Sequence, residues 1–131
     1  MIEHGKFTNN SSNKTVICGK KIMNLSTPVV MGIVNLTDDS FYDGGKYNCL
    51  ESAKWRIEEI VCQKADIIDL GACSTRPGAE LVPVEEEIRR LIPAIRFIKS
   101  EFPDVPISID TVWSEVCIVA INEGADIIND I

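Results

Sequence analysis

Histidine is almost absent from this sequence, and so are the cysteine patterns that mark metal sites and disulfide-rich folds. The single histidine, His4, lies in a polar stretch near the start, which excludes histidine-centred catalysis and most transition-metal sites from these residues. Five cysteines occur, but their number is odd and no two follow the C-x-x-C spacing, so neither a disulfide framework nor a zinc knuckle is indicated. Any bound metal is therefore expected to be held by oxygen atoms.

Basic residues are also scarce relative to acidic ones, and long apolar runs are missing. Thirteen lysines and arginines stand against twenty aspartates and glutamates, giving a net charge of -7, which repels nucleic acids and anionic lipid surfaces. No apolar run approaches the roughly 20 residues that cross a bilayer, and the first 14 residues lack the apolar core of a signal peptide. We therefore expect a cytoplasmic protein that binds neither nucleic acid nor membrane.

The sequence does contain enough apolar residues for one core. Of its 131 residues, 45% are hydrophobic, as in an ordinary globular domain. Residues 1–14 are polar and predict a flexible N-terminal tail, whereas residues 15–131 predict one domain. Two short runs at 16–18 and 21–23 flank Gly19-Lys20, and this pattern predicts a β-hairpin.

Beyond the hairpin, four short strands are predicted. They are rich in isoleucine and valine, too short for helices, and typical of parallel strands buried on both faces. Their ranges are 29–35, 66–71, 105–110 and 126–130. The second and fourth strands begin with nearly the same residues, ADIID at 65–69 and ADIIN at 125–129, which indicates a repeating scaffold.

Helices are predicted between these strands from apolar residues at helical spacing. Their ranges are 50–64, with Asn48 as the N-cap, 83–100, and 114–123, which ends at Gly124. Strands that alternate with helices require parallel pairing and right-handed crossovers. The fold is therefore α/β, either a doubly wound sheet or a (β/α)8 barrel, and spacing alone does not separate the two.

Polar residues stand at or just beyond the end of each predicted strand. They are Asn35, Asp69 with the Ser74-Thr75-Arg76 segment after it, Asp110-Thr111, and Asn129-Asp130. Ligands bind at the carboxyl ends of strands in both α/β architectures. A helix cap or a turn is the ordinary role for any one of these residues, but four such ends in succession favour a binding site.

Longer motifs at these ends resemble a known family. Residues 31–45 read MGIVNLTDDSFYDGG and residues 74–79 read STRPGA, which resemble the first two signatures of the dihydropteroate synthase family. The weaker motifs SIDT at 108–111 and IINDI at 127–131 follow in the family's order. The resemblance covers residues 31–131 and implies a (β/α)8 TIM-type barrel, of which this chain supplies the N-terminal half: the first four β/α units after a hairpin.

The resemblance also implies an activity. Dihydropteroate synthase is a transferase of folate biosynthesis and a target of sulfonamides. It condenses 6-hydroxymethyl-7,8-dihydropterin diphosphate with p-aminobenzoate to give 7,8-dihydropteroate and diphosphate. The resemblance further implies Mg2+ as the cofactor and a homodimer as the full-length enzyme.

Several site residues come with the resemblance. Asp110 and Asn129 match the family's pterin-binding residues, and a carboxylate beside an amide suits a pterin edge that offers both donors and acceptors. Asn35 matches the residue near the Mg2+ that accompanies the diphosphate, and a neutral oxygen ligand with several waters suits this ion. Thr75 matches a diphosphate contact. A helix cap for Asp110 and a turn for Asn35 are the alternatives.

Two loops supply the remaining matches. Asp43 and Arg76 match the family's flexible-loop residues and are the candidate catalytic side chains, with Arg76 also holding diphosphate through its planar guanidinium. Phe41 and Pro77 are candidates for the p-aminobenzoate pocket. An Asp-Gly turn at Asp43, a surface charge at Arg76 and core or turn roles for Phe41 and Pro77 are the alternatives.

The sequence departs from the family pattern at two positions. Asp38 stands where the first signature usually has proline, so the loop loses a fixed φ angle, and its closure is expected to differ. Cys73 stands where the second signature usually has glutamate.

Two other readings of the chain stay open. A pterin-binding methyltransferase would share Asp110 and Asn129 without needing the two loops. A non-catalytic half-barrel that assembles through its open sheet edges is the other reading, since the family's later aspartate, lysine, arginine and histidine have no counterpart here.

Overall fold

A parallel sheet with helices on one side forms the body of the protein. The computed structural model describes residues 14–37, 46–73, 78 and 80–130, without the side chains of 46–49. The sheet strands are β3 (Met31–Asn35), β4 (Ile67–Gly71), β5 (Ile107–Asp110) and β6 (Ile127–Asn129). They pair in parallel in the order β3-β4-β5-β6, as predicted. A sequential order is that of a barrel, whereas a doubly wound sheet would reverse it.

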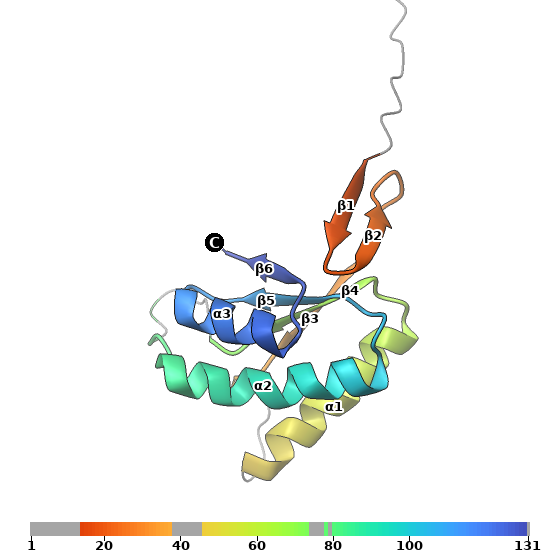
Figure 1. Ribbon diagram of the computed structural model, residues 1–131. Coiled ribbons are helices and arrows are strands. Elements are labelled where there is room, and N and C mark those ends of the chain that lie inside the picture. Colours follow the sequence, from red (N-terminus) through yellow and green to blue (C-terminus); the bar gives the residue numbers. More distant parts are fainter. Residues whose placement is uncertain (1–13, 38–45, 74–77, 79, 131) are drawn as a thin grey trace, which may run out of the picture.

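Three helices connect these strands within the described part of the chain. Figure 1 shows α1 (Lys46–Cys62), α2 (Val84–Glu101) and α3 (Ser114–Glu123) on the same face of the sheet. The prediction for α1 was wrong at its start, because the helix begins before residue 50 and Asn48 lies inside it rather than capping it. Asparagine's preference for caps is weak enough for neighbouring residues to override it. The bounds of α3 are as predicted, and Gly124 ends it at φ 113.

The N-terminal hairpin packs across one end of the sheet. Its strands, β1 (Thr15–Cys18) and β2 (Lys21–Asn24), pair antiparallel as predicted. Cys18 and Met23 are buried with Ile67, which begins β4, and Ile127 of β6 packs against them. The hairpin therefore covers the end at which the parallel strands begin and leaves their carboxyl ends open (Figure 1).

The core lies between the sheet and the helices. Val34, Leu70 and Ile109 point from successive strands toward Ile57 of α1 and Ile95 of α2, and all five are almost completely buried. Residues one position away in each strand point to the opposite face, because side chains alternate along a strand. That second face carries no helix in the described part of the chain.

The repeated aspartates Asp66 and Asp126 form hydrogen bonds with the backbone at the starts of neighbouring strands. Oδ2 of Asp66 accepts a hydrogen bond of 2.8 Å from the backbone N–H of Val30, just before β3. Oδ2 of Asp126 accepts one of 3.0 Å from the N–H of Ile107, the first residue of β5. Each aspartate also donates its own N–H to the carbonyl of the same neighbour. The echo in the sequence is therefore a repeated structural connection between adjacent strands.

No helix in the described ranges has the length and apolarity to cross a bilayer.

Candidate functional site

A row of residues crosses the carboxyl end of the sheet. Asn35 pairs in register with Gly71, Gly71 with Asp110, and Asp110 with Asn129. Partners in adjacent parallel strands point to the same face, so the side chains of Asn35, Asp110 and Asn129 share the face without helices. The structure thus brings together three of the residues singled out from the sequence. We call these four positions the strand-end row.

Gly71 leaves space inside the strand-end row. A Cβ atom at this position would lie 3.5 Å from Oδ1 of Asn35 and 3.8 Å from Oδ2 of Asp110. The amide oxygen and the carboxylate therefore flank the same gap. Sequence reasoning did not select Gly71, although a glycine at the end of a strand is a known sign of close approach by a ligand.

A second polar row lies one step deeper on the same face. Asn129 donates from Nδ2 to Oδ2 of Asp69 at 3.3 Å, and Asp69 pairs in register with Ser108. Both Asp69 and Ser108 are buried, and Oδ1 of Asp69 and Oγ of Ser108 have no hydrogen-bond partner among the described residues. Buried polar atoms without partners are rare, so these two atoms are able to hydrogen-bond a ligand. We call Asp69 and Ser108 the polar floor.

Asp110 has an unusual electrostatic environment. Burial raises the pKa of its carboxyl group, and the negative charge of Asp69 raises it further. The N-cap of α3 is Trp113, so the alternative role of Asp110 as the cap of that helix is wrong. A carboxylate at a strand end, turned toward the open face and without a structural capping role, is available to a ligand.

A buried acid lies behind the sheet at the same end. Glu87, in the first turns of α2, is 0% exposed, and its carboxyl oxygens have no partner of normal geometry in the described structure. Burial raises its pKa, and the charge of Asp110 adds to this, while neighbouring Thr111 and Arg90 act in the opposite direction. From the sequence alone, Glu87 is only one of three acidic residues in the first turn of α2, where negative charge complements the helix dipole.

Glu87 should make the stability of the protein depend on pH. Because its pKa is higher in the folded than in the unfolded state, its contribution is most favourable at low pH and is lost as the pH rises through the folded value. Glu87→Gln should therefore gain free energy of unfolding relative to the wild type as the pH rises from the ordinary glutamate pKa of about 4.3 through the raised pKa of the folded protein. Urea denaturation at several pH values measures this difference. Glu85→Gln, exposed on the same turn, is the control, and a pH-independent difference for Glu87→Gln would contradict the prediction.

The remaining candidates from the sequence lie outside the described residues. They are Phe41, Asp43, Thr75, Arg76 and Pro77. Asp38 is outside them as well, whereas Cys73 is a described, partly buried residue. The described residues contain no group of three histidine, cysteine, aspartate or glutamate side chains that could hold a metal.

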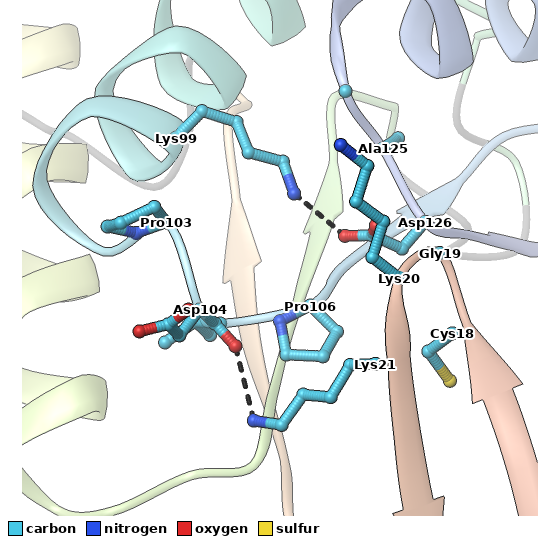
Figure 2. Close-up of a pocket in the computed structure, with 12 residues that line it drawn as sticks. Cys18, Gly19, Lys20, Lys21, Lys99, Pro103, Asp104, Pro106, Ala125 and Asp126 are labelled. Atoms are coloured by element: carbon cyan, nitrogen blue, oxygen red, sulfur yellow. Dashed lines mark hydrogen bonds and ion pairs between the residues drawn. The ribbon is translucent and has the colours of Figure 1, made fainter.

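A cavity lies at the opposite end of the sheet. It has a volume of about 680 Å³ and is lined by the hairpin turn and by the segments that lead into β5 and β6. Figure 2 shows its two lysine contacts: Lys99 pairs with Asp126 at 2.9 Å, and Lys21 donates to the carbonyl of Asp104 at 3.1 Å. These lysines are already engaged, and the cavity is far from the strand-end row.

The strand-end row and the floor beneath it have a definite binding chemistry. Asp110 supplies acceptors, and Asn129 supplies both an acceptor and a donor. Asn129 uses one N–H for Asp69, and its side-chain carbonyl oxygen is an acceptor next to Asp110 in the strand-end row. Such a pair suits a flat ring whose edge carries adjacent N–H groups.

Comparison with known proteins agrees with this geometry. The family model described as "Pterin binding enzyme" matches residues 31–131. The dihydropteroate synthase of Clostridium beijerinckii is 52% identical over 102 residues, which cover 78% of this chain and 38% of that protein.

Solved structures give the same result. The Xanthomonas albilineans dihydropteroate synthase with 4-aminobenzoic acid superposes with a TM-score of 0.82 and 45% identity, over 88% of this chain and 43% of that one. The Burkholderia cenocepacia enzyme with 7,8-dihydropteroate has a TM-score of 0.76 and 38% identity, over 89% and 38%. The chain therefore spans about two fifths of the length of the relatives it matches.

Proposed function

Because this chain belongs to the family of pterin binding enzymes, we propose that it forms the N-terminal part of a dihydropteroate synthase. The full-length protein, meaning this chain followed by the remaining length of its relatives, would join 6-hydroxymethyl-7,8-dihydropterin diphosphate to p-aminobenzoate. The observation that carries the proposal is the strand-end row with its polar floor. The similarity to dihydropteroate synthases disfavours the methyltransferase and non-catalytic readings.

Asp110 and Asn129 would bind the pterin ring. A pterin presents an amino group beside a ring N–H, and the acceptors of Asp110 and Asn129 match these donors. The closeness of Asp69, which holds the amide of Asn129, supports this orientation. Leaving either ring donor without a partner in a buried site would weaken binding strongly.

Asn35 would lie at the diphosphate end of the site, with Thr75 and Arg76. Its side chain is exposed at the open end of β3, and its oxygen faces the same gap as Asp110. One neutral oxygen with room for several waters fits Mg2+, which keeps much of its hydration shell in proteins. When bound, Mg2+ would neutralise charge on the departing diphosphate.

The two loops would complete the chemistry. The bond between the pterin methylene and the diphosphate oxygen breaks, the amine nitrogen of p-aminobenzoate bonds to the methylene, and the amine loses a proton. Asp43 would stabilise positive charge on the methylene, and Arg76 would hold the leaving diphosphate. Phe41 and Pro77 would line the p-aminobenzoate pocket. We also propose a cytoplasmic location and a homodimer for the full-length protein.

Gly71 provides a test that separates folding from binding. In the full-length protein, Gly71→Ala should fold normally, because its nearest atoms lie at ordinary contact distances of 3.5 to 3.8 Å. Its methyl group would fill the gap between Asn35 and Asp110 and should lower kcat/KM by about 10- to 200-fold. Dihydropteroate formation from pterin diphosphate, p-aminobenzoate and Mg2+ measures this effect, and a wild-type protein without turnover would refute the proposed function.

Gly32→Ala is the matched control for Gly71→Ala. Its Cβ would lie 2.2 Å from Cγ2 of Ile60, so α1 would have to move away from β3. We expect a clear fall in melting temperature for this variant and none for Gly71→Ala. Equal destabilisation by the two substitutions would show that Gly71 has a packing role instead.

A further inference from the structure

Arg90 of α2 joins two strand ends from behind the sheet. Its Nη1 donates to the carbonyl oxygens of Leu36, at 3.4 Å, and Ala72, at 3.3 Å. Leu36 directly follows Asn35 of β3, and Ala72 directly follows Gly71 of β4. One guanidinium group therefore holds the backbone immediately beyond two positions of the strand-end row.

The ends of β3 and β4 extend past their regular pairing. The N–H of Leu36 donates to the carbonyl of Gly71 at 2.6 Å, and beyond this bond the regular β3–β4 ladder stops. Carbonyl groups past the end of a ladder need other donors when they are buried. Leu36 and Ala72 are both buried, and Arg90 supplies those donors.

Glu86 holds Arg90 in this orientation. Nε of Arg90 contacts Oε1 of Glu86 at 2.8 Å, and the Arg90 side chain is only 13% exposed. Hydrogen bonds from Arg89 and then Arg90 lower the pKa of Glu86 to about 2, so Glu86 is ionised at neutral pH. The pair keeps its charges, and the planar guanidinium is fixed with its other edge toward the carbonyls.

A helix-surface ion pair alone does not explain Arg90. Such pairs contribute little to stability, and Arg89 already forms one with the same glutamate while 54% exposed. Arg90 differs in being mostly covered and in reaching residues 54 and 18 positions away in the chain. Its reach suggests a role at the strand ends.

We propose that Arg90 is a positioning residue that fixes the diphosphate side of the site by locking the ends of β3 and β4. The proposal rests on the proposed function, since Asn35 is the residue it places. The pterin side, formed by Asp110 and Asn129, lies on β5 and β6, whereas the two carbonyls that Arg90 contacts follow β3 and β4. Loss of Arg90 should therefore affect the two parts of the substrate unequally.

The test compares Arg90→Leu with Arg89→Leu in the full-length protein, because each variant loses one positive charge and one arginine contact with Glu86. Calorimetry with pterin diphosphate should show at least about a tenfold loss of affinity for Arg90→Leu, since misplacement by 1 Å can cost about a hundredfold. Affinity for 6-hydroxymethylpterin, which lacks the diphosphate, should change less than about twofold. Arg89→Leu should leave both affinities unchanged.

A measurement without ligand completes the test. Hydrogen exchange of the Leu36 amide should be faster in Arg90→Leu than in the wild type and unchanged in Arg89→Leu. If Arg90→Leu does not fold, Arg90→Lys serves in its place, because one ammonium nitrogen keeps the charge but cannot serve Glu86 and both carbonyls.

The possible outcomes separate the two proposals. Equal loss of affinity for both pterins, or unchanged exchange at Leu36, would overturn the role of Arg90. A wild-type protein that binds neither pterin would refute the proposed function, while the exchange measurement would still decide whether Arg90 locks the strand ends.

Discussion

Asp110→Ala in the full-length protein should lower kcat/KM for pterin diphosphate by between about 100- and about 10,000-fold. The substitution removes a carboxylate from the strand-end row and leaves the ring donors of the pterin without acceptors in a buried site. The fold should persist, because Asp110 caps no helix and its side chain lies on the face without helices. Steady-state kinetics and thermal unfolding of the same preparation measure the two effects.

The pH dependence of pterin binding gives an independent check on Asp110. Binding needs the ionised carboxylate, so affinity should fall as the pH drops through the raised pKa of Asp110. Asp69→Asn removes the charge that contributes to this raised pKa and keeps an oxygen for Asn129. The acidic limb should therefore move to lower pH in Asp69→Asn. An unchanged limb would mean that another group controls binding.

Residues 1–131 by themselves should form no measurable dihydropteroate. This prediction follows from their span of about two fifths of related enzymes, because barrel catalysis needs groups from several strand ends held around one substrate. The edge strands β3 and β6 each also leave one side without a partner in the described structure, which favours association. Mass-verified protein that ends at Ile131 should be assayed beside the full-length protein.

Turnover by the shorter protein would contradict this expectation in a specific way. If activity appeared and disappeared again in Asp110→Ala, this part of the barrel would be sufficient, and two copies would be the simplest way to complete the site. Size-exclusion chromatography with light scattering would then show whether the active species is a dimer.

The architecture could be predicted because its signals are local. The apolar runs, the Gly124 terminus and the hairpin turn each act over a few residues, and the structure confirms all of them. The start of β5 was placed too early: Pro106 has no N–H to donate, and the strand begins only at Ile107. The start of α1 was missed because Asn48 was interpreted as its cap, although asparagine also occurs inside helices.

The candidate site could be predicted only in part. Asp110 and Asn129 stand at the ends of apolar runs and lie within motifs, and these two local signals together select them. Gly71, Glu87 and Arg90 could not be found this way, because their importance comes from neighbours that the fold brings close from far along the chain. Asp43, Thr75 and Arg76 stay predictions that rest on the motif resemblance.

The repeated segments 65–69 and 125–129 meet at the one position where they differ. If both copies ended in aspartate, two carboxylates would face each other across β5, and the hydrogen bond between these positions would be lost. The second copy instead ends in asparagine, and its amide donates to Asp69 of the first at 3.3 Å. Internal symmetry is thus kept at the strand starts, where Asp66 and Asp126 each accept a backbone hydrogen bond from a neighbouring strand. It is broken at the strand ends, where the two copies supply one carboxylate and one amide instead of two carboxylates.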